Sequence, residues 1–408
     1  MKIAIITVGD EILIGEIRDT NSIWMVAELT REGFEIVNII TVGDNEEDIA
    51  KGIDFAFSRA DIVLMTGGVG PTRDDVTKRA LCNYFHTGLT FDQEVLQQIE
   101  RLFAKRNFTL NEPTRNQAYV PQGCTVIQNR VGTAPLLWFE RENQLLVSMP
   151  GVPFEMKSAM REEIIPRLKS RFLQDEYLKS HFLVSGITES SLALQLEKFE
   201  RQLPEDFSLA YLPANGLIRL RLSVRGLSRL PEMQLQTEQL KRELQERLVA
   251  ESDEPVELLL GKALRGRKLT ISTAESCTGG YIAHRITLVP GASEYYKGSV
   301  VSYDNRIKIS MLDVSRSAIE SFGAGSREVV EEMALQVAAK MESDCSIAVS
   351  GVAGPDGGTA LNPVGTVWIS TRLHDRQMTQ RYQFGLSREE NINRTTNMAI
   401  VQMMKMLG

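Results

Sequence analysis

The sequence is poor in cysteine and histidine, the residues that build disulfide scaffolds and zinc sites. Its 408 residues include four of each, and no two cysteines stand in a CxxC pair. These numbers exclude a disulfide framework and a clustered zinc site, and they indicate a reducing compartment. Any bound metal would have to be held by carboxylates, which are the ligands that Mg²⁺ prefers.

Long apolar runs and an excess of positive charge are also missing. No stretch of 18 apolar residues occurs, and the apolar run at the N-terminus is short and ends in acidic residues. We therefore expect neither a membrane span nor a signal peptide. The net charge is -7, from 46 basic and 53 acidic residues, which argues against a role in coating nucleic acid. These features predict a cytoplasmic protein with neither a membrane nor a nucleic-acid partner.

The first part of the chain alternates short apolar segments with amphipathic ones. Buried strands are expected at 3–8, 36–42 and 62–65, because these segments are short, apolar and rich in β-branched residues. Helices are expected at 21–31 and from Asn45 onward, where Asn45 is followed by acidic residues suited to a helix N-terminus. This alternation predicts a parallel sheet covered by helices.

Two changes of pattern divide the rest of the chain. The alternation fades near Leu168, and the residues from 180 to 250 read as a small α+β unit. Strands and helices alternate again after the acidic stretch that ends at Pro255. We therefore expect an α/β protein of three domains, at residues 1–170, 171–252 and 256–408.

A glycine-rich loop, Thr66 to Thr72, follows the third predicted strand. Glycines there let the backbone approach an anion, and ligands of open α/β sheets bind at such strand ends. Asp74 and Asp75 follow at once, and two carboxylates beside a phosphate suit a bridging Mg²⁺. The alternative is a tight turn with an aspartate as helix cap, because the loop is neither a Walker A loop nor a GxGxxG fingerprint.

Other predicted strand ends also combine glycine with an acidic residue. In chain order the segments are TVGDEIL at 7–13, DTN at 19–21, TVGD at 41–44, GGVGPTRDD at 67–75 and PGVP at 150–153. This set resembles the molybdopterin-binding (MoCF-like) domain, in the form found at the front of CinA proteins. The resemblance implies a doubly wound sheet over residues 1–170 and metal-dependent binding of a pyrophosphate-containing ligand. Hydrolysis of ADP-ribose is the hypothesis for this domain, and molybdopterin is less expected.

Carried over residue by residue, the resemblance implies two groups of site residues. The nucleotide-binding residues would be Gly9, Asp10, Glu11, Asp44, Gly67, Gly68, Gly70, Pro71 and Thr72. The ligands of a divalent metal such as Mg²⁺ would be Asp74 and Asp75.

The βαββα pattern of residues 180–250 is similar to the KH-like insert of CinA proteins. A KH module that grips RNA uses a GxxG loop. None occurs in this segment, where Gly216 and Gly226 stand alone. We therefore favour a structural role for it, as a spacer or a dimer contact.

In the last third of the chain, Ser276 lies between a strand expected at 269–273 and a helix opened by Thr278, Gly279 and Gly280. A hydroxyl at a helix N-terminus has backbone N–H groups aimed at it, and such donors stabilise an oxyanion or a phosphate. The alternative is that Ser276 only caps the helix.

The base that would activate Ser276 is not a nearby residue of the chain. His284 is eight positions on, about 12 Å away along a helix, and no Asp-His pair is evident, so a Ser-His-Asp triad is disfavoured. An SxxK motif is absent, because position 279 is glycine. A lysine whose pKa is lowered by burial can act as the base. Lys308, which with Tyr303 brackets a turn after an expected strand, is the candidate. The alternative, which the residues alone favour, is that this segment is only the polar end of a strand.

Three segments in this part of the chain occur in a characteristic order. They are AESCTGG at 274–280, GSVVSYDNRIK at 298–308 and the glycine-rich SGVAGPDGG at 350–358. Together they resemble the C-terminal domain of CinA, the nicotinamide-nucleotide amidase family, from about residue 256 to 405. With the two preceding parts included, the whole chain resembles a full-length CinA protein.

This resemblance implies an amidohydrolase that converts nicotinamide mononucleotide and water to nicotinate mononucleotide and ammonia, with no cofactor required. Ser276 would be the nucleophile, Lys308 its general base and Tyr303 a proton relay, and N–H groups near Thr278 and Gly279 would form the oxyanion hole. A homodimer is also implied. The residues that would hold the nucleotide are Gly351, Gly354, Gly357, Gly358, Arg388 and Arg394.

The chain departs from the family pattern at three places, none of which removes a proposed catalytic group. It has Asp304 where the family usually has serine, Gly325 where it has valine, and Asn362 where it has lysine. Asp304 is the departure that matters most, because a carboxylate near Lys308 favours the charged form of the amine and opposes its use as a base.

Two other interpretations remain open. Cys277 is a rival nucleophile, because thiols are intrinsically better nucleophiles and this one also lies near a helix start. The chain could instead be a non-catalytic nucleotide-binding sensor or scaffold linked to competence or DNA damage, which predicts tight nucleotide binding without turnover.

Overall fold

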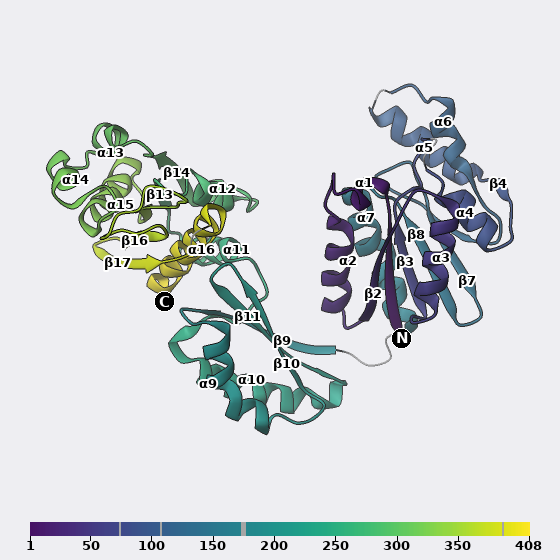
Figure 1. Cartoon of the computed structure of the whole chain (residues 1–408), viewed down its shortest axis with the longest axis horizontal. Coiled ribbons are helices and arrows are strands. Elements are labelled where there is room, and N and C mark those ends of the chain that lie inside the picture. The colour runs from purple at the N-terminus through teal and green to yellow at the C-terminus, as the bar shows by residue number, and fades with distance from the viewer. Residues whose placement is uncertain (73–74, 107, 173–176, 386) are drawn as a thin grey trace. The chain divides into compact units, whose positions relative to one another are not determined.

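The computed structural model describes residues 1–72, 75–106, 108–172, 177–385 and 387–408. The chain forms two compact units, Met1–Tyr177 and Leu178–Gly408. Each unit combines helices with its own sheets (Figure 1), which confirms the expected α/β class. No described helix is long and apolar enough to cross a membrane.

The first unit is built on a six-stranded sheet with the order β2-β1-β3-β8-β7-β6. The strands from β2 to β8 run parallel, and β7 and β6 are antiparallel additions at one edge. A separate pair, β4 with β5, is antiparallel. The strand bounds are Lys2–Val8 (β1), Glu35–Val42 (β2), Ile62–Thr66 (β3), Leu89–Phe91 (β4), Tyr119–Pro121 (β5), Thr125–Ile127 (β6), Leu136–Arg141 (β7) and Gln144–Met149 (β8).

Helices cover both faces of this sheet (Figure 1). Alternate side chains of β1 point to opposite faces, so Ile3 and Ile5 join the core under α2, α7 and α8, while Ala4 and Ile6 join the core under α3, α4 and α5. This is the doubly wound arrangement that the sequence predicts. The helix bounds are Asp10–Leu13 (α1), Thr20–Arg31 (α2), Glu46–Phe57 (α3), Thr77–Tyr84 (α4), Gln93–Arg106 (α5), Glu112–Arg115 (α6), Pro153–Ala159 (α7) and Ile165–Phe172 (α8), with a 3-10 turn at Asn116–Ala118 and a π turn at Met160–Ile164.

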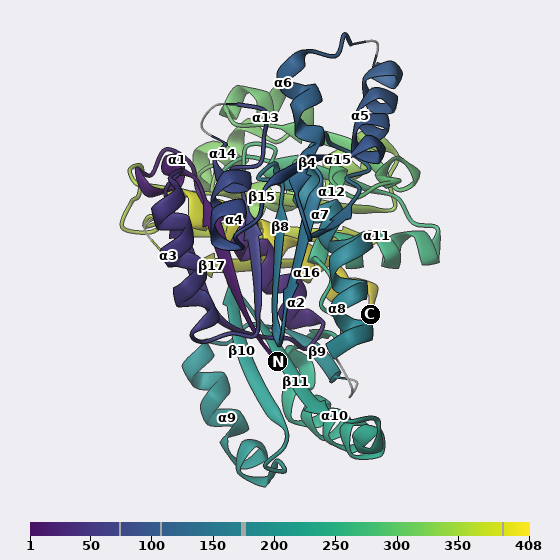
Figure 2. The ribbon, with the colours of Figure 1, turned by 90° about the vertical axis from the view of Figure 1, so that its right-hand side faces the viewer.

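The second unit begins with a four-stranded sheet, in the order β10-β11-β9-β12, with α9 and α10 packed side by side against it (Figure 1, Figure 2). The βαββα pattern predicted from the sequence is present, and β12 is an addition. The charged sequence from Glu232 to Leu248 predicts a single long helix, but α10 ends at Leu244, because Gln245 adopts a positive φ of 49°. The element bounds are Tyr177–Ser185 (β9), Glu189–Gln202 (α9), Ser208–Ala214 (β10), Leu217–Arg225 (β11), Leu230–Leu244 (α10) and Leu248–Ala250 (β12), with 3-10 turns at Leu227–Arg229 and Gln245–Arg247.

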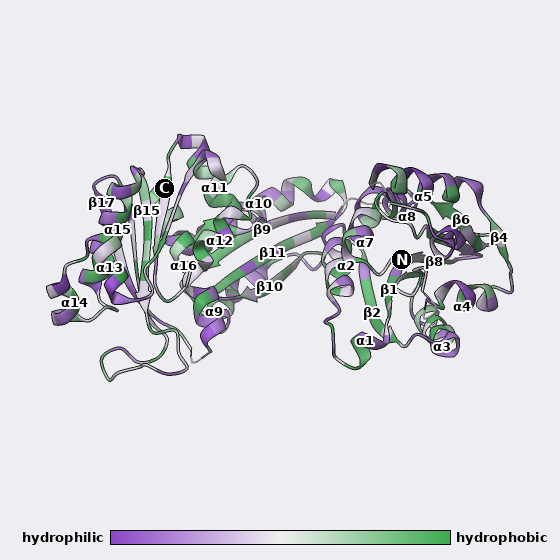
Figure 3. Ribbon diagram, turned by 90° about the horizontal axis from the view of Figure 1, so that it is seen from above, coloured by the Kyte–Doolittle hydropathy of each residue, from purple (hydrophilic) through white to green (hydrophobic). Residues whose placement is uncertain are grey.

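The rest of the second unit surrounds a five-stranded sheet with the order β14-β13-β15-β16-β17. Its first three strands are parallel and the last two are antiparallel. The helices α11, α12 and α16 pack on one core, and α13, α14 and α15 pack on the other. In Figure 3 strands such as β1, β2 and β15 are largely green, which places the hydrophobic residues inside the layers.

The strands of this part are Ile271–Glu275 (β13), Tyr296–Val301 (β14), Cys345–Gly351 (β15), Thr366–Leu373 (β16) and Arg376–Gln383 (β17). The helices are Val256–Arg267 (α11), Tyr281–Thr287 (α12), Asn305–Leu312 (α13), Arg316–Phe322 (α14), Arg327–Met341 (α15) and Arg388–Leu407 (α16), with a 3-10 turn at Ala292–Glu294.

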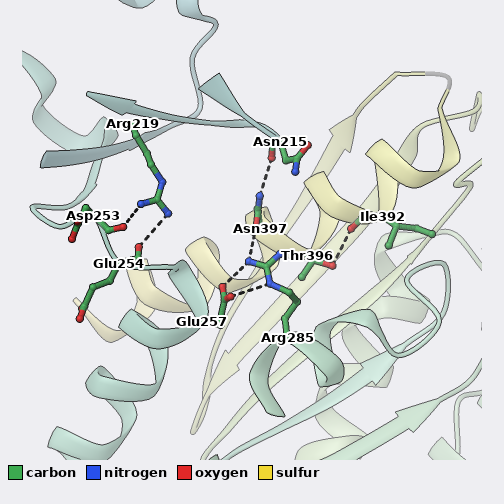
Figure 4. A network of polar contacts seen from close by, with 9 residues as sticks. All are labelled: Asn215, Arg219, Asp253, Glu254, Glu257, Arg285, Ile392, Thr396 and Asn397. Atoms are coloured by element: carbon green, nitrogen blue, oxygen red, sulfur yellow. Dashed lines mark hydrogen bonds and ion pairs between the residues drawn. The ribbon is translucent and has the colours of Figure 1, made fainter. Parts of the chain in front are cut away.

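The two parts of the second unit share a polar network at the β10–β11 turn (Figure 4). Asn397 of α16 donates a hydrogen bond to the carbonyl of Asn215 (3.1 Å) and accepts one from Arg285 of α12 (3.4 Å). Arg285 also forms a bidentate ion pair with Glu257 of α11, at 3.1 and 2.6 Å, in a site largely shielded from solvent. Helix α12 is thereby fixed to α11, to α16 and to the hairpin of the preceding sheet.

Candidate active site

Ser276 lies in a tight turn at the carboxyl end of β13, the strand between β14 and β15. Its backbone N–H donates to the carbonyl of Val349 in β15 (3.1 Å). On the other side, the N–H of Ser302 donates to the carbonyl of Glu275 (2.7 Å). The turn is therefore tied to both neighbouring strands, at the sheet edge where open α/β folds place their ligands.

Lys308 reaches the same point from helix α13. Its amine nitrogen lies 3.0 Å from the hydroxyl oxygen of Ser276 and donates to the carbonyl of Ser302 at 2.7 Å. The side chain is almost fully buried, at 1% exposure, and this burial lowers the pKa of Lys308 below its ordinary value. A neutral amine at this distance has a lone pair that can accept the serine proton.

Asp304 is turned toward Arg306 rather than toward Lys308. It caps α13 by accepting from the N–H of Arg306 (2.7 Å), and its carboxylate also accepts from the Arg306 guanidinium (3.2 and 3.1 Å). The contacts with Arg306 lower the pKa of Asp304. Asp304 does favour the charged form of Lys308, as expected, but burial lowers the pKa of Lys308 more strongly than Asp304 raises it.

Cys277 is directly beside Ser276 and is buried. It is part of the buried core under α11 and α12. Burial raises the pKa of the Cys277 thiol to about 12, so the thiol stays protonated at neutral pH. A protonated thiol is a weak nucleophile, and the local environment therefore favours Ser276 over Cys277.

The start of the following helix differs from the prediction. Gly279 and Gly280 have positive φ values of 60° and 97°, and α12 begins only at Tyr281. The N–H of Gly279 donates to the carbonyl of Ser276 at 3.1 Å. That amide is used inside the turn here, and an oxyanion hole formed by N–H groups near Thr278 and Gly279 stays a prediction. The hydroxyl of Thr278 donates to Glu275 at 2.6 Å.

A pocket of about 360 Å³ opens in front of Ser276 and Lys308. Arg388, at the start of α16, donates to the Tyr303 hydroxyl and to the Gly354 carbonyl, both at 2.7 Å. The structure thus brings the proposed nucleophile, base, relay and one phosphate-binding arginine to a single pocket. Its lining residues are Ser276, Cys277, Tyr303, Asn305, Lys308, Gly323, Ala324, Gly325, Ser350, Gly351, Val352, Ala353, Thr359, Asn362 and Arg388.

Several residues predicted for nucleotide binding lie elsewhere. Arg394 packs beside Gly216 of the β10–β11 turn and contacts Glu390 at 3.4 Å. It is six positions after Arg388, and at 3.6 residues per turn these two side chains leave α16 in different directions. Gly358 packs against the backbone at Val364. Neither it nor Gly357, Thr278 or Gly279 is among the lining residues.

The sequence interpretation missed the pocket residues Asn305, Thr359 and Asn362 and the loop 323–325. Asn305 lies in the quoted segment 298–308 but was not singled out there, and the others belong to no motif with a chemical signature of its own. The loop joins the site through hydrogen bonds, because Ser350 donates to the carbonyl of Ala324 (2.7 Å) and Asn362 donates to that of Gly325 (3.3 Å). Gly325 and Asn362 are two of the positions at which the chain departs from the family pattern. Those departures were the sign in the sequence that pointed to the loop 323–325 and to Asn362.

The first unit has its own pocket, of about 490 Å³, at the carboxyl ends of β1 and β3. Asp10 and Thr72 are not among its lining residues. Asp10 and Asp44 exchange backbone-to-carboxylate hydrogen bonds at 2.8 and 3.2 Å. The predicted residues that line the pocket are Gly9, Glu11, Asp44, Gly67, Gly68, Gly70, Pro71 and Asp75. The lining residues that the site prediction lacked include Asp19, Asn21, Gln117 and Glu155.

Steric contacts explain why glycine occupies positions 67 and 68 of the loop. Gly67 has a φ of 110°, and a Cβ there would lie 2.2 Å from the carbonyl oxygen of Val8. Gly68 has a φ of 62°, and its Cβ would lie 2.3 Å from the Thr77 hydroxyl. Only glycine lets the loop lie this close to the end of β1 and to α4.

The expected metal ligands receive no support from the described residues. Asp74 lies outside them. The Asp75 carboxylate accepts from the N–H groups of Gly70 (2.7 Å) and Thr72 (2.8 Å) and from the Thr72 hydroxyl. Asp75 therefore closes the loop, as the tight-turn alternative predicts, but it does not cap the helix, because α4 has Val76 at its cap position and no side-chain cap hydrogen bond. Within the described ranges, no three His, Cys, Asp or Glu side chains gather in a way that could hold a metal ion.

Comparisons with known proteins match a separate domain to each of the two parts of the chain that hold these pockets. Residues 253–407 match the CinA C-terminal domain, and residues 4–170 match a probable molybdopterin binding domain. CinA-like proteins of Flavobacterium psychrophilum and Cytophaga hutchinsonii are both 41% identical to this chain. The first match covers 99% of this chain and 98% of the relative, and the second covers 98% and 96%.

Among solved structures, the protein CinA of unknown function from Thermoplasma acidophilum is 31% identical, with 40% of this chain and 97% of that one covered and a TM-score of 0.37. A score this low carries no argument about the fold. Because the two CinA-like relatives are 41% identical to this chain over nearly its whole length, the chain belongs to the CinA-like proteins.

Proposed function

We propose that the second unit is a nicotinamide mononucleotide amidase. One observation carries the proposal: a fully buried lysine amine of lowered pKa lies 3.0 Å from a serine hydroxyl, in a pocket that also holds an arginine. A serine with a neutral lysine as its base is suited to acyl transfer. The pocket volume, about 360 Å³, is within the usual range for small-molecule sites, roughly 300–1,000 Å³.

The proposed reaction has two halves. In the first, the Ser276 oxygen attacks the carboxamide carbon while Lys308 takes the serine proton. The lysine returns that proton to the amide nitrogen, the C–N bond breaks, and ammonia leaves behind an acyl ester on Ser276. In the second half, Lys308 takes a proton from water, the hydroxide attacks the ester, and nicotinate mononucleotide leaves as Ser276 regains its proton.

Tyr303 and Arg388 would act beside this pair. The Tyr303 hydroxyl accepts a hydrogen bond from Arg388, which leaves its own proton available to a substrate or to a transfer chain. Arg388 carries a permanent positive charge and suits a phosphate of the nucleotide. These two roles are proposed because both side chains line the same pocket as Ser276 and Lys308.

The test is ammonia release from nicotinamide mononucleotide by the full chain, with nicotinate mononucleotide measured as the second product. The proposal expects both products in equal amounts, without added metal. Tight nucleotide binding with no product would support the sensor or scaffold interpretation and would overturn the amidase proposal.

For the first unit we propose binding of a pyrophosphate-containing nucleotide such as ADP-ribose. The support is the pocket of about 490 Å³, with glycine loops and carboxylates at the strand ends. Since the described carboxylates do not converge as metal ligands, we derive no metal-dependent step. Calorimetry with ADP-ribose, together with a ³¹P assay for cleavage in the presence of divalent metals, tests binding and hydrolysis separately. Absence of binding would overturn the proposal.

A further inference from the structure

Glu275, the residue directly before Ser276, has an unusual environment for a carboxylate. It is 0% exposed, and four hydrogen-bond donors converge on its two oxygens. Oε2 accepts from the Thr278 hydroxyl (2.6 Å), the Ile282 N–H (3.0 Å) and the Gly280 N–H (3.1 Å), and Oε1 accepts from the Ala283 N–H (2.8 Å). Buried charges are retained where hydrogen bonds compensate for lost water.

These four donors span the turn after Ser276 and the first residues of α12. The first N–H groups of a helix have no partner inside the helix and need a cap. A serine or threonine at the start usually supplies it. Here Gly280 occupies the cap position, where it has no side chain to offer. The Glu275 carboxylate meets that need from the end of β13.

We propose that Glu275 is a positioning residue for Ser276. Its side chain ties the turn after Ser276 to the first amides of α12, and so holds the Ser276 hydroxyl facing Lys308. The proposal rests on the proposed role of Ser276 as nucleophile, and it assigns no contact between Glu275 and the substrate. Ser276 itself is not the helix cap, because α12 begins at Tyr281 and Gly280 occupies the cap position.

A glutamine at position 275 keeps the size of the side chain but not its hydrogen bonding. If its oxygen takes the place of Oε2, its NH₂ group faces the Ala283 N–H, where two donors meet at about 2.8 Å. If the amide is turned over, the three bonds to Oε2 are lost instead. In both cases amides near Ser276 lose their acceptor, and the negative charge that suits a helix N-terminus is removed.

If Glu275 only stabilised the fold, loss of a comparable carboxylate far from Ser276 would slow the reaction of the serine equally. A matched control variant is therefore needed. Asp344 provides it, because its carboxylate accepts from the N–H and the hydroxyl of Thr270, both at 2.8 Å, at the opposite end of β13. Six residues of extended chain separate Thr270 from Ser276, about 20 Å. Asp344→Asn thus makes the same chemical change, carboxylate to carboxamide, at a residue that is bonded to the other end of β13, far from the nucleophile.

The experiment measures the reactivity of the serine itself, using a fluorophosphonate that phosphonylates activated serines with loss of fluoride. The full chain is labelled well below its melting temperature, the labelled residue is identified by mass spectrometry, and Ser276→Ala serves as the blank. Glu275→Gln is expected to label Ser276 about 10- to 100-fold more slowly, the size of effect that a small misplacement of a reacting group produces. Asp344→Asn is expected to label within about twofold of wild type, a ratio far below that misplacement effect.

A folded Glu275→Gln protein that labels at the wild-type rate overturns the proposal, and so does an equal slowing in Asp344→Asn. If Glu275→Gln does not fold, Thr278→Val removes a single one of the four donors and must slow labelling to sustain the proposal. For nicotinamide mononucleotide turnover, the positioning role predicts a fall in kcat with little change in KM. Because labelling needs no nucleotide, a wild-type protein that labels at Ser276 without releasing ammonia would refute the proposed substrate and leave the role of Glu275 intact.

Discussion

The amine of Lys308 lies 3.0 Å from the hydroxyl oxygen of Ser276, although 32 positions separate the two residues in the chain. Ser276 comes from the end of β13 and Lys308 from the helix after β14. The parallel pairing of these two strands brings them together. Burial of the lysine, which lowers its pKa, makes this pair suited to nucleophilic chemistry.

Replacement of Lys308 by methionine is expected to lower ammonia release by about 100-fold or more, the contribution of a positioned general base. Its effect on stability should depend on pH. Because the folded pKa of Lys308 lies below the ordinary value of 10.5, the unfolded chain binds more protons between these two values, and stability rises with pH across that window.

Urea unfolding of wild type and Lys308→Met at pH 7 and pH 9.5 measures this effect. Wild type is expected to gain stability relative to the variant as the pH rises. A stability difference that is constant with pH would contradict the burial of a titrating amine at position 308.

Asp304→Asn tests the electrostatic influence on the base. Asparagine is also a good helix cap, so α13 is expected to stay intact. Because Asp304 raises the pKa of Lys308 and burial lowers it, loss of the Asp304 charge should lower the lysine pKa further. The rising limb of the pH profile of kcat should therefore move to lower pH. A shift to higher pH, or loss of the limb, would show that Lys308 is not the titrating base.

Arg388 and Arg394 were both predicted to hold the nucleotide phosphate, and the structure separates them. Arg388→Ala is expected to raise KM for nicotinamide mononucleotide about tenfold or more, since charged hydrogen bonds contribute roughly 1.5–3 kcal/mol. Arg394→Ala changes a side chain that packs beside Gly216, so its KM is expected to stay near wild type. Steady-state kinetics of the two variants measure both KM values. An equal rise in KM for the two would contradict the finding that Arg388 lines the pocket and Arg394 does not.

How far the sequence predicts this structure depends on the range of the interaction. The strands β1, β2 and β3 were predicted to within about two residues, because a buried strand needs a local apolar run. The cap of α3 by Asn45, which accepts from the Asp48 N–H at 2.9 Å, is equally local. The end of α10 was misplaced because the backbone turn at Gln245 has no glycine or proline to mark it.

The site shows the same limit. Ser276 and Lys308 were singled out from the residues and given their roles, like Arg388, by a family resemblance. Their meeting in one pocket depends on strand pairing that no local pattern encodes. The capping carboxylate of Glu275 was missed because the buried glutamate reads, in sequence, as the end of a strand beside a polar turn. Asp75 was read as a metal ligand because spacing alone does not show that the loop amides of Gly70 and Thr72 occupy its oxygens.

Cys277→Ala separates the two candidate nucleophiles. Because burial holds the thiol pKa at about 12, the thiolate is scarce at neutral pH and its removal should leave kcat within about twofold of wild type, since only the thiolate attacks. Ammonia release measured at pH 7 checks this. A loss as large as that caused by substitution of Ser276 would favour the thiol.

The central claim is tested most directly by ammonia release from nicotinamide mononucleotide, measured for wild type and for Ser276→Ala at equal concentration. We predict that the wild type releases ammonia and nicotinate mononucleotide in equal amounts. The variant should retain at most about one part in a thousand of that rate, because loss of a nucleophile removes the covalent route. Full activity in Ser276→Ala, or no ammonia from folded wild type, would contradict the account.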